Sequence, residues 1–385
     1  MLVNINKNIQ YPLSFSPKYP KQALGQDFDG SIPVREPTPT ERKRFEPSIL
    51  VVGRKDSCTV YRFLSGQGTG YMTSYEIYPG IMLSYNEFAM KDIPSNGRPY
   101  MDMIEINHCK EGRFECSAQD GKVSYLGKGD LAVHRRSFLP VRPSFPLGYY
   151  YGITVLIELP KIQPKLKRQL KDLDIELDKL PQLLNLDALP FYMRSTDKIE
   201  HIFSEMYDIQ QEYRPTYLKM KLLELLYFIY HTPKGWLFDM RDAYIPCQQA
   251  DIIKRVHAYL VDNIEQHITI KQLSKQFPLA ETTLKTGFKT VYGASIGDYL
   301  RNYRIQVAAG RLSTGEASVT EVALSVGYEN PSKFAAAFKA KTGRTPLEYQ
   351  KQMLSGQASP CVRCALYGAA RMSTACLEQN FAYME

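Results

Sequence analysis

The spacing of apolar residues changes along the chain, and each change predicts a different kind of structure. Between residues 48 and 160, short runs of β-branched and aromatic residues alternate with Gly, Pro and Asn. Such runs predict β-strands separated by turns. They are Ile49–Val52, Ser74–Tyr78, Ile81–Phe88, Ile104–His108, Arg113–Ser117 and Gly152–Leu159. Because the runs are short and closely spaced, they predict a β-sandwich or a β-barrel.

Residues 161–240 show the longer apolar period of helices. Leucines recur on one predicted helical face at Leu166, Leu170, Leu173 and Leu177. Residues 217–230 then form a strongly apolar helix. These helices could pair between two subunits, or they could cover the β-rich region of their own chain, since an apolar stripe serves either purpose. A polar stretch with a proline around residues 239–249 predicts a linker.

After the linker, the apolar positions predict a first helix-turn-helix unit. An amphipathic helix is defined by Ile252, Ile253, Val256, Tyr259, Leu260 and Ile264. Thr269 stands at the N-cap position of a second helix, which ends before Pro278 because proline lacks an amide proton. A short third helix begins near Glu281 and ends at Gly293. Its predicted buried positions are Leu284, Phe288 and Val291.

The same arrangement recurs further along the chain, and this recurrence is stronger evidence than either copy alone. Ser318 and Glu321 have the S-x-x-E spacing of a capping box, which opens a helix that runs to the turn at Gly327. Asn330 can cap a following helix that has Pro331 at its first position. The predicted buried positions of this helix are Phe334 and Phe338.

One long helix is predicted between the two units, over residues 296–312. Residues near one face of this helix are Tyr299, Leu300, Tyr303 and Leu312. A rigid connector fixes the separation of the units that it joins.

Taken together, these patterns predict an α+β multidomain protein, with an amino-terminal β-barrel or sandwich, following helices and an all-α carboxy-terminal domain. The predicted segments are an irregular leader at 1–47, a β-rich sensor or regulatory domain at 48–160, a helical segment with a possible dimerisation role at 161–240, a linker at 241–249, the two helix-turn-helix units at 250–354 and a tail at 355–385.

Charge and composition narrow the class of protein. The net charge is +8, and residues 250–354 hold 14 Lys or Arg against 9 Asp or Glu, a net of +5. Such a surplus attracts phosphate backbones through counterion release, although it also suits an ordinary solvated surface.

The sequence has no apolar run of about eighteen residues and no secretory signal, so we expect a cytoplasmic protein with no membrane partner. The seven cysteines lack framework spacing, so they are predicted to be reduced thiols.

Residues 250–352 resemble the DNA-binding domain of the AraC family of transcription regulators. The matching positions are Phe288, Lys289, Gly293, Tyr299, Leu300, Arg304, Ala308, Val319, Ala323, Gly327, Tyr328, Phe334, Phe338, Lys339, Gly343, Thr345, Pro346 and Tyr349. The resemblance implies two recognition helices that enter successive major grooves on one face of DNA, about 34 Å apart.

The sequence departs from the family pattern at several positions. Ala280 stands where the family commonly has a capping Ser, and Gln350 replaces a common Arg. Residues 335–337 are all Ala, which leaves the second recognition helix short of long polar side chains. We therefore expect the first unit to carry most of the sequence specificity.

Seven residues are the candidate DNA contacts. Base readers of the first unit are Thr282, Lys285 and Thr286, and those of the second unit are Ser332 and Lys333. Lys289 and Lys339 are predicted to contact phosphates. For any one of them, the alternative is an ordinary solvated side chain.

The β-rich region has a Gly127–Asp130 turn after a run at Val123–Leu126. This pattern resembles the cupin-like sensor barrels that many members of the family carry, and a small barrel can hold a ligand. Aromatic residues that could line a cavity or form ordinary core are Tyr75, Tyr78, Tyr85, Phe88 and Phe114. Ordinary core is the commoner role of such side chains, so no ligand-binding residue is assigned.

Signatures of enzymes are missing from the sequence. Cupin enzymes hold a metal through two histidines spaced by one residue, and no H-x-H is present. His108 and His134 are isolated, and His108, near Glu105, is predicted to be a sheet-surface or core histidine, so no metal is expected. No G-x-S-x-G is present, and residues 66–70 predict a hairpin turn rather than a phosphate loop. We predict that the protein is not an enzyme and needs no cofactor.

The predicted tail contains one C-x-x-C motif, at Cys361 and Cys364, with Cys376 beyond it. A structural zinc site needs four ligands, so none is expected here. Reduced thiols are the simplest interpretation, and thiol redox sensing is the alternative.

Three hypotheses about function follow. The favoured one is a sequence-specific DNA-binding transcription regulator, of the activator type, that is controlled by an effector or partner at the amino-terminal domain. In the second, that domain binds only another protein. The third, a cupin-type enzyme with an accessory DNA-binding domain, is disfavoured by the missing metal ligands. Candidate partners are double-stranded DNA, a small-molecule effector, RNA polymerase and a second copy of the chain.

Overall fold

The computed structural model describes the chain from Ile49 to Ser355, with internal gaps. The described segments are residues 49–55, 57–65, 68–93, 103–117, 121–135, 144–187, 190–209, 214–232, 244–315 and 317–355. The predicted leader, the cysteines of the predicted tail, part of the predicted linker and residues 66–67 of the predicted hairpin turn lie outside the described residues.

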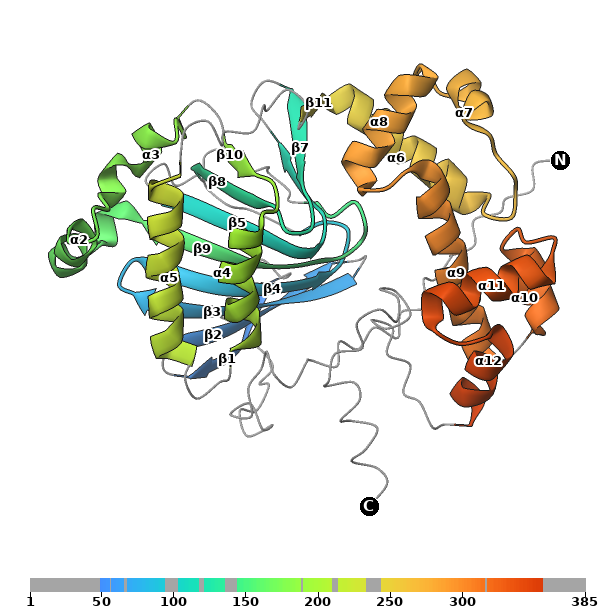
Figure 1. The fold of residues 1–385 in the computed structure, drawn as a ribbon, viewed down its shortest axis with the longest axis horizontal. Helices are drawn as coiled ribbons and strands as arrows, with labels where there is room; N and C mark the ends of the chain where they lie inside the picture. Colours follow the sequence, from blue (N-terminus) through green and yellow to red (C-terminus); the bar gives the residue numbers. More distant parts are fainter. Residues whose placement is uncertain are drawn as a thin grey trace. The chain divides into compact units, whose positions relative to one another are not determined.

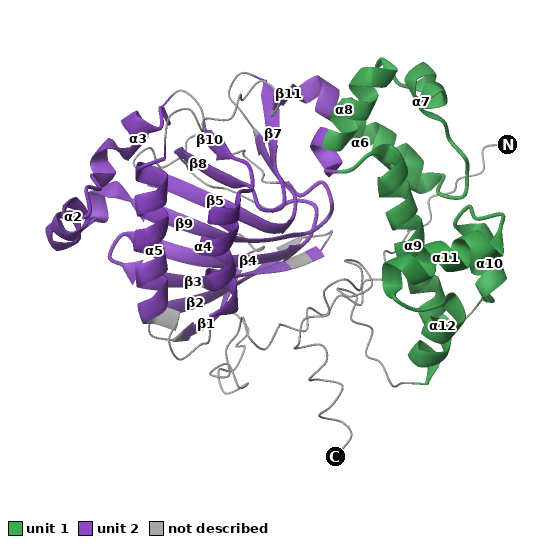
Figure 2. Ribbon diagram, in the orientation of Figure 1, with its two compact units in different colours: residues 1–15, 251–289, 294–385 green, residues 16–250, 290–293 purple. Residues whose placement is uncertain are grey.

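The described residues form two compact units (Figure 2). The sheet-rich unit holds the described residues between 49 and 250 together with residues 290–293, and the helical unit holds the rest of residues 251–355. The prediction of a mixed α and β protein, with a β-rich amino-terminal region and a helical carboxy-terminal region, is confirmed. Within the described part of the chain, no helix has both the length and the apolar character needed to cross a membrane.

Two antiparallel sheets build the sheet-rich unit (Figure 1). The larger sheet has the order β1 (Ile49–Lys55), β2 (Cys58–Ser65), β3 (Gly68–Tyr78), β4 (Ile81–Ala89), β9 (Tyr150–Glu158), β5 (Met103–Gly112), β8 (Leu131–Arg135) and β10 (Phe191–Met193). The smaller sheet has the order β11 (Tyr244–Pro246), β7 (Lys122–Leu126) and β6 (Phe114–Ser117). Every predicted strand is confirmed, whereas β2, β8, β10 and β11 were not predicted.

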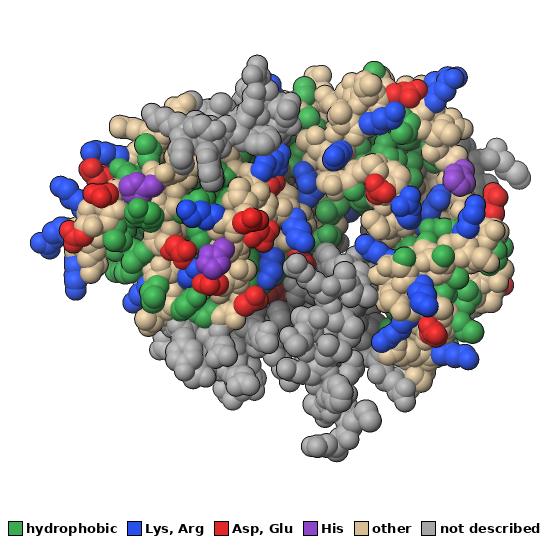
Figure 3. All heavy atoms as spheres, viewed as in Figure 1, with side chains coloured by type: hydrophobic (Ala, Val, Ile, Leu, Met, Phe, Trp, Pro, Cys, Tyr) green, Lys and Arg blue, Asp and Glu red, His purple; other side chains and the backbone are tan. Residues whose placement is uncertain are grey.

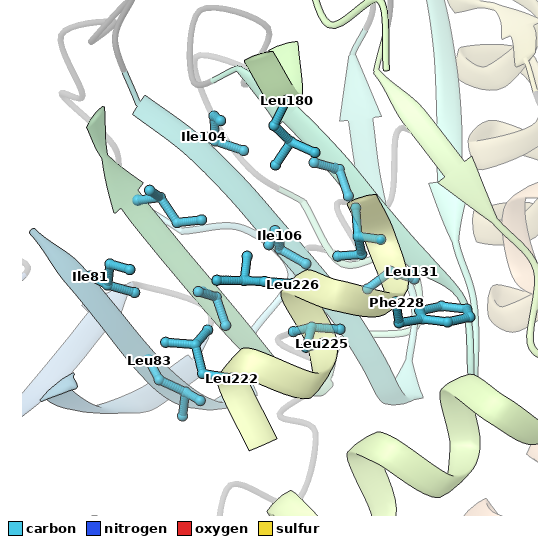
Figure 4. Close-up of a cluster of buried hydrophobic side chains, with 14 of the residues drawn as sticks. Ile81, Leu83, Ile104, Ile106, Leu131, Leu180, Leu222, Leu225, Leu226 and Phe228 are labelled. Carbon is cyan, nitrogen blue, oxygen red and sulfur yellow. The ribbon is translucent and has the colours of Figure 1, made fainter. Parts of the chain in front are cut away.

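One face of the larger sheet is covered by helices α4 (Asp197–Asp208) and α5 (Arg214–Tyr230), as Figure 1 shows. Because side chains alternate along a strand, every second residue of β4, β5 and β9 points to this face. The apolar side chains that meet there include Ile81, Leu83, Ile104, Ile106, Leu222, Leu225 and Leu226 (Figure 4). Burying each one stabilises the fold by roughly 1.5–3 kcal/mol, so α5 is part of the core of its own chain.

Aromatic side chains fill the space on the opposite face of the sheet. Phe88 stacks on Phe145 with ring centroids 5.4 Å apart, and Phe145 stacks on Tyr150 at 5.1 Å. Phe114 joins the same buried cluster. Of the aromatic residues singled out in the sequence, Tyr85, Phe88 and Phe114 are buried, and Tyr75 and Tyr78 pack against the helix-side core. The core role favoured for them is confirmed.

The two singled-out histidines are core residues, one on each face of the sheet. His108 is 2% exposed, its ring stacks on Phe203 at 3.9 Å, and its Nδ1 lies 3.1 Å from the Tyr207 hydroxyl. Burial lowers the pKa of His108 to about 3, so the ring is neutral at physiological pH. His134 is equally buried, and its Nε2 lies 3.3 Å from Asn107 Nδ2.

The prediction that one helix carries all four leucines of residues 166–177 is wrong. Helix α2 (Pro164–Lys171) buries Leu166 and Leu170 and then stops, because Asp174 adopts a left-handed backbone with φ of 56°. Leu173 is consequently 41% exposed, and Ile175 takes the buried place beside the core. Leu177 is also buried, but it is the first residue of a separate 3-10 helix, η3 (Leu177–Lys179). This 3-10 helix leads into α3 (Leu180–Leu183).

A buried lysine joins the two helices on the sheet. The Lys221 ammonium of α5 is 6% exposed and lies between Glu205 of α4, at 2.8 Å, and Glu224 of its own helix. Tyr217 donates a hydrogen bond of 2.6 Å to Glu205. The hydrogen bonds from Lys221 and Tyr217 lower the pKa of Glu205 to about 2. A charged Glu205 therefore stabilises the contact between α4 and α5.

Between residues 247 and 354, the described residues form seven helices. They are α6 (Cys247–Asp262), α7 (Ile270–Gln276), α8 (Glu281–Tyr292), α9 (Ile296–Thr314), α10 (Val319–Ser325), α11 (Pro331–Thr342) and α12 (Pro346–Leu354). The sequence predicted the first six and missed α12. Helix α9 is the predicted long connector, and it runs from α8 to the α10–α12 group (Figure 1).

Glu205→Gln should destabilise the protein at neutral pH and matter less in acid. The unfolded carboxyl titrates near 4.5 and the folded one near 2. The contribution of the charged group is therefore complete above the unfolded value and disappears as the pH falls through the folded one. Thermal unfolding of both proteins from about pH 7 to about pH 2 measures this, and the gap in melting temperature should close in that window. A gap independent of pH would contradict the assignment, and Glu176→Gln, which removes an exposed pair with Lys179, is the near-neutral control.

Candidate nucleic-acid interface

The supporting helix of the first unit begins at a reciprocal cap. The Thr269 hydroxyl accepts a hydrogen bond from the Gln272 amide at 3.3 Å, and the Gln272 side chain accepts one from the Thr269 amide at 2.8 Å. The predicted N-cap at Thr269 is confirmed, and Gln272 completes it. Leu273 then anchors α7 in the interior with 0% exposure.

One face of α8 is fully buried. Leu284, Phe288 and Val291 each have 0% exposure, as the apolar spacing predicted. The Phe288 ring packs edge-on against Tyr299 of α9 at 5.6 Å. Tyr299 is held in turn by His257 of α6, whose Nε2 lies 2.7 Å from the tyrosine hydroxyl. These contacts fix the rotation of α8 about its own axis.

The opposite face of α8 is exposed and polar. Four predicted contact residues are all exposed, at Thr282, Lys285, Thr286 and Lys289. The Thr286 hydroxyl donates a 2.9 Å hydrogen bond to the Thr282 carbonyl of its own helix, so it offers mainly its lone pairs to a ligand. Glu281 is exposed on the same face and was not predicted. Its position next to Thr282, one turn before Lys285, was the available signal.

The second unit repeats the cap of the first. The Ser318 hydroxyl accepts from the Glu321 amide at 3.2 Å, and the Glu321 carboxylate accepts from the Ser318 amide at 2.8 Å. The hydrogen bond from the Ser318 amide, together with one from the Ser318 side chain, lowers the pKa of Glu321. The predicted capping box is therefore confirmed, and Val322, Ala323 and Val326 follow it into the core.

Helix α11 is capped and anchored as predicted. The Asn330 side-chain oxygen accepts from the amides of Ser332 at 2.9 Å and Lys333 at 3.1 Å. Phe334 and Phe338 are both 0% exposed. Phe338 packs edge-on against Tyr349 of α12 at 5.4 Å.

The missed helix α12 covers the second unit from outside the helix-turn-helix motif. Its start has the same reciprocal cap, between Thr345 and Glu348. The S/T-x-x-E spacing of these two residues was a readable signal. In the middle of this helix, Gln350 donates a 2.9 Å hydrogen bond to the Ala317 carbonyl, so this departure from the family pattern has a structural role.

The exposed face of α11 carries fewer polar groups than that of α8. Ser332, Lys333 and Lys339 are exposed, as predicted. Ala336, between Lys333 and Lys339, and Ala340, directly after Lys339, expose only methyl groups, which suit apolar contact with a thymine methyl. Lys and Arg side chains are spread over the visible face of the helical unit (Figure 3). The arrangement suits a polyanion that is contacted by two helices.

Comparisons with known proteins agree on this region. A family of helix-turn-helix domains matches residues 273–352. Regulatory protein SoxS of Escherichia coli (strain K12) is 29% identical over 102 residues, covering 26% of this chain and 95% of SoxS. Raffinose operon transcriptional regulatory protein RafR of Pediococcus pentosaceus is 27% identical over 277 residues, covering 69% of this chain and 91% of RafR. A crystal structure of a "probable AraC family transcriptional regulator" from Rhodopseudomonas palustris CGA009 is 27% identical and covers 27% of this chain and 97% of its own, with a TM-score of 0.25.

Asn330→Ala should destabilise α11 without opening a cavity. The change removes the acceptor of two amide hydrogen bonds, and loss of such a cap costs about 1 kcal/mol. Urea unfolding monitored by circular dichroism measures the difference. Thr320→Ala changes an exposed residue of α10 and should stay within about 0.5 kcal/mol of the parent protein. Equal effects of the two changes would show that the cap does not hold the helix.

Proposed function

Because the chain belongs to the AraC family of DNA-binding transcription regulators, we propose that α8 and α11 read base pairs in two successive major grooves of one duplex. The observation that carries this proposal is the repeated design of the two helices. Each has a fully buried aromatic anchor on one face and exposed polar or basic residues on the other. A helix of this kind fits the width of the major groove.

The two helices have unequal roles in this proposal. Thr282, Lys285 and Thr286 of α8 contact base edges and carry most of the specificity. Ser332 and Lys333 of α11 make fewer base contacts, since the exposed side chains of Ala336 and Ala340 on the same helix cannot form hydrogen bonds. Lys289 and Lys339, near the carboxy-terminal ends of their helices, contact phosphates.

Selection of bound sequences from random DNA with the full-length protein, at several salt concentrations, tests the proposal. We expect a bipartite site whose two elements are about one helical turn apart, with more information in one element than in the other. Binding that follows ionic strength without any sequence preference would overturn it.

We also propose that the sheet-rich unit, as a cupin-like barrel within residues 48–160, controls DNA binding through a small-molecule effector. The support is a chain of buried and half-buried polar side chains on the sheet face opposite α4 and α5. Asn107 lies at its centre: its amide donates to Glu105 at 2.9 Å and lies 3.3 Å from His134 Nε2, and its carbonyl oxygen accepts from Thr154 at 2.6 Å. Asn86 donates to Thr154 at 2.8 Å.

This polar chain crosses four neighbouring strands, β4, β9, β5 and β8. A purely structural core would gain more from apolar residues, because each buried polar group costs free energy that its hydrogen bonds only offset. Hydroxyl, amide and carboxylate groups of this kind can exchange hydrogen bonds with a polar, uncharged ligand. We propose such a ligand as the effector. A barrel that binds only another protein is the alternative.

We also propose two protein partners and a cellular location. Helix α5 exposes Met220 by 61% and Tyr227 by 51%, and we propose this face, within the helical segment 161–240, for contact with a second copy of the chain. We propose an activator that works in the cytoplasm, contacts RNA polymerase and catalyses no reaction. A molar mass measured by light scattering at several protein concentrations tests the dimer.

Lys285→Ala and Lys339→Ala should affect DNA binding in different ways. Loss of a base contact should relax preference at particular base pairs by roughly 1–3 kcal/mol, so Lys285→Ala changes the selected sequence. Loss of a phosphate contact should weaken binding to all sequences and reduce the slope of affinity against salt by about 1. Dissociation constants on the selected site and its single-base variants, at several salt concentrations, separate the two. Uniform weakening by both changes would show that the recognition face is misplaced.

A thermal-shift screen of metabolites should find an effector that stabilises the sheet-rich unit. At a concentration of about 100 times its dissociation constant, the ligand adds about 2.7 kcal/mol to the stability of the folded state. Asn107→Leu should abolish the shift, because it removes the centre of the polar chain. Lys285→Ala is the control and should keep the whole shift. A ligand that stabilises both variants equally binds elsewhere.

A further inference from the structure

Two recognition helices can read one duplex together only if the two units keep a fixed rotation and separation. Helix α9 joins them, and its two halves serve different cores. Its first turns pack on the first unit through Tyr299, whereas Ile305, Ala308 and Leu312 belong to the core of the second. We infer that Arg304, at the boundary between these halves, is a positioning residue that locks the second unit onto the first. This inference rests on the proposed function.

Arg304 holds the first unit through two backbone carbonyls. Its Nε donates a 2.9 Å hydrogen bond to the Ile264 carbonyl, and its Nη2 donates one of 2.9 Å to the Gln266 carbonyl. Both carbonyls lie in the turn between α6 and α7, about forty residues before the arginine in the chain. The planar guanidinium presents its donors in a fixed fork, so two bonds define the orientation of the turn as well as its distance.

The second helix-turn-helix unit also approaches the turn at residues 264–266. Gly327, between α10 and α11, has a φ of +80°. A Cβ atom added there would lie 2.7 Å from the Glu265 carbonyl oxygen and 3.0 Å from Arg304 Nη2. The backbones of the two units therefore approach each other directly, and only a residue without a side chain fits between them.

The contact continues from this turn to the recognition helix. Tyr328 follows Gly327, and its ring packs edge-on against Phe334, an anchor of α11, at 5.4 Å. Burial raises the pKa of Tyr328, and the positive charge of Arg304 opposes that rise. A continuous set of contacts thus runs from the turn at residues 264–266 through Arg304, Gly327 and Tyr328 to α11.

Arg311 provides a matched comparison on the same helix. It lies seven residues after Arg304 and donates a 3.2 Å hydrogen bond to the Ser325 carbonyl of α10. Both partners belong to the second unit. Arg311→Ala therefore removes the same charge and a similar hydrogen bond from α9 without touching the junction between the units.

The consequence is a strict spacing of the two DNA elements. Each base pair added between them moves the second element by about 3.4 Å and turns it by about 35°. A locked pair of units cannot follow this change, and it loses the gain from binding both elements at once. Two units joined by a flexible junction can adjust in part to the displaced DNA element.

The test measures dissociation constants of the full-length protein on three kinds of DNA. They are the selected site, the same site with one or two base pairs inserted between its elements, and the site with its second element scrambled. For the parent protein and for Arg311→Ala, we expect a loss of about 100-fold on a two-base-pair insertion. For Arg304→Ala, we expect about tenfold weaker binding to the selected site but less than about a threefold further loss on insertion. Arg304→Lys, which can bond only one carbonyl well, should fall between them.

Several outcomes decide the matter. Unchanged spacing preference in Arg304→Ala would overturn the inference. So would uniform weakening on all three DNAs with a flatter salt dependence, since that result identifies a phosphate contact. Binding to the scrambled site should stay the same, which shows that the first unit remains folded. If the parent protein itself shows no bipartite preference, the proposed function fails, and this inference fails with it.

Two glycine variants test the contact between the two units without changing Arg304. Gly327→Ala should push the two turns apart and flatten the spacing preference as Arg304→Ala does, because its Cβ would meet the Glu265 carbonyl. Gly310→Ala is the control, since an added Cβ there meets nothing within 4 Å. It should leave the spacing preference at that of the parent protein. A parent-like profile for Gly327→Ala would show that the contact between the turns does not set the spacing.

Discussion

The helical unit depends on the burial of one face of two short helices. Helices α8 and α11 have 12 residues each, a length at which an isolated helix is marginal in water, so their stability comes from packing. Phe288 in one helix and Phe334 with Phe338 in the other supply it. Because a helix buried on one side has no freedom to rotate, the same contacts decide which residues face the solvent. The exposed surface that is proposed to read DNA is thus a consequence of the core.

The three reciprocal caps serve the same end at the level of the backbone. Thr269, Ser318 and Thr345 each begin a helix whose third residue returns a hydrogen bond. Each cap satisfies backbone amides that would otherwise lack partners, and it fixes the residue at which the helix starts. The start of a helix sets the direction of every later side chain on it. Caps and aromatic anchors together specify the position of the exposed faces.

The sheet-rich unit places two kinds of interior on one sheet. On β5, Ile104 and Ile106 meet the helices, while Glu105 and Asn107 point to the other face. The alternation of a strand makes this possible within four residues. The helix-side interior is apolar and fixes the fold, whereas the other side combines aromatic packing with a hydrogen-bonded polar chain. One sheet thus carries a stable scaffold on one face and, on the other, the polar groups proposed to bind an effector.

Local signals in the sequence determined the helix-turn-helix units, because caps such as Ser318 with Glu321 and anchors such as Phe338 act over three or four residues. Alternation predicted most of the longer strands for the same reason, although it missed β2, which has eight residues. The sequence did not predict β10 and β11, which have three residues each, or the stop of α2 at Asp174, where a left-handed backbone overrides a regular leucine spacing. It also could not join Asn107 to His134, or Arg304 to the carbonyls of Ile264 and Gln266, since those contacts span about thirty to forty residues. Periodicity records which side of an element is buried, and only the tertiary structure decides what lies against it.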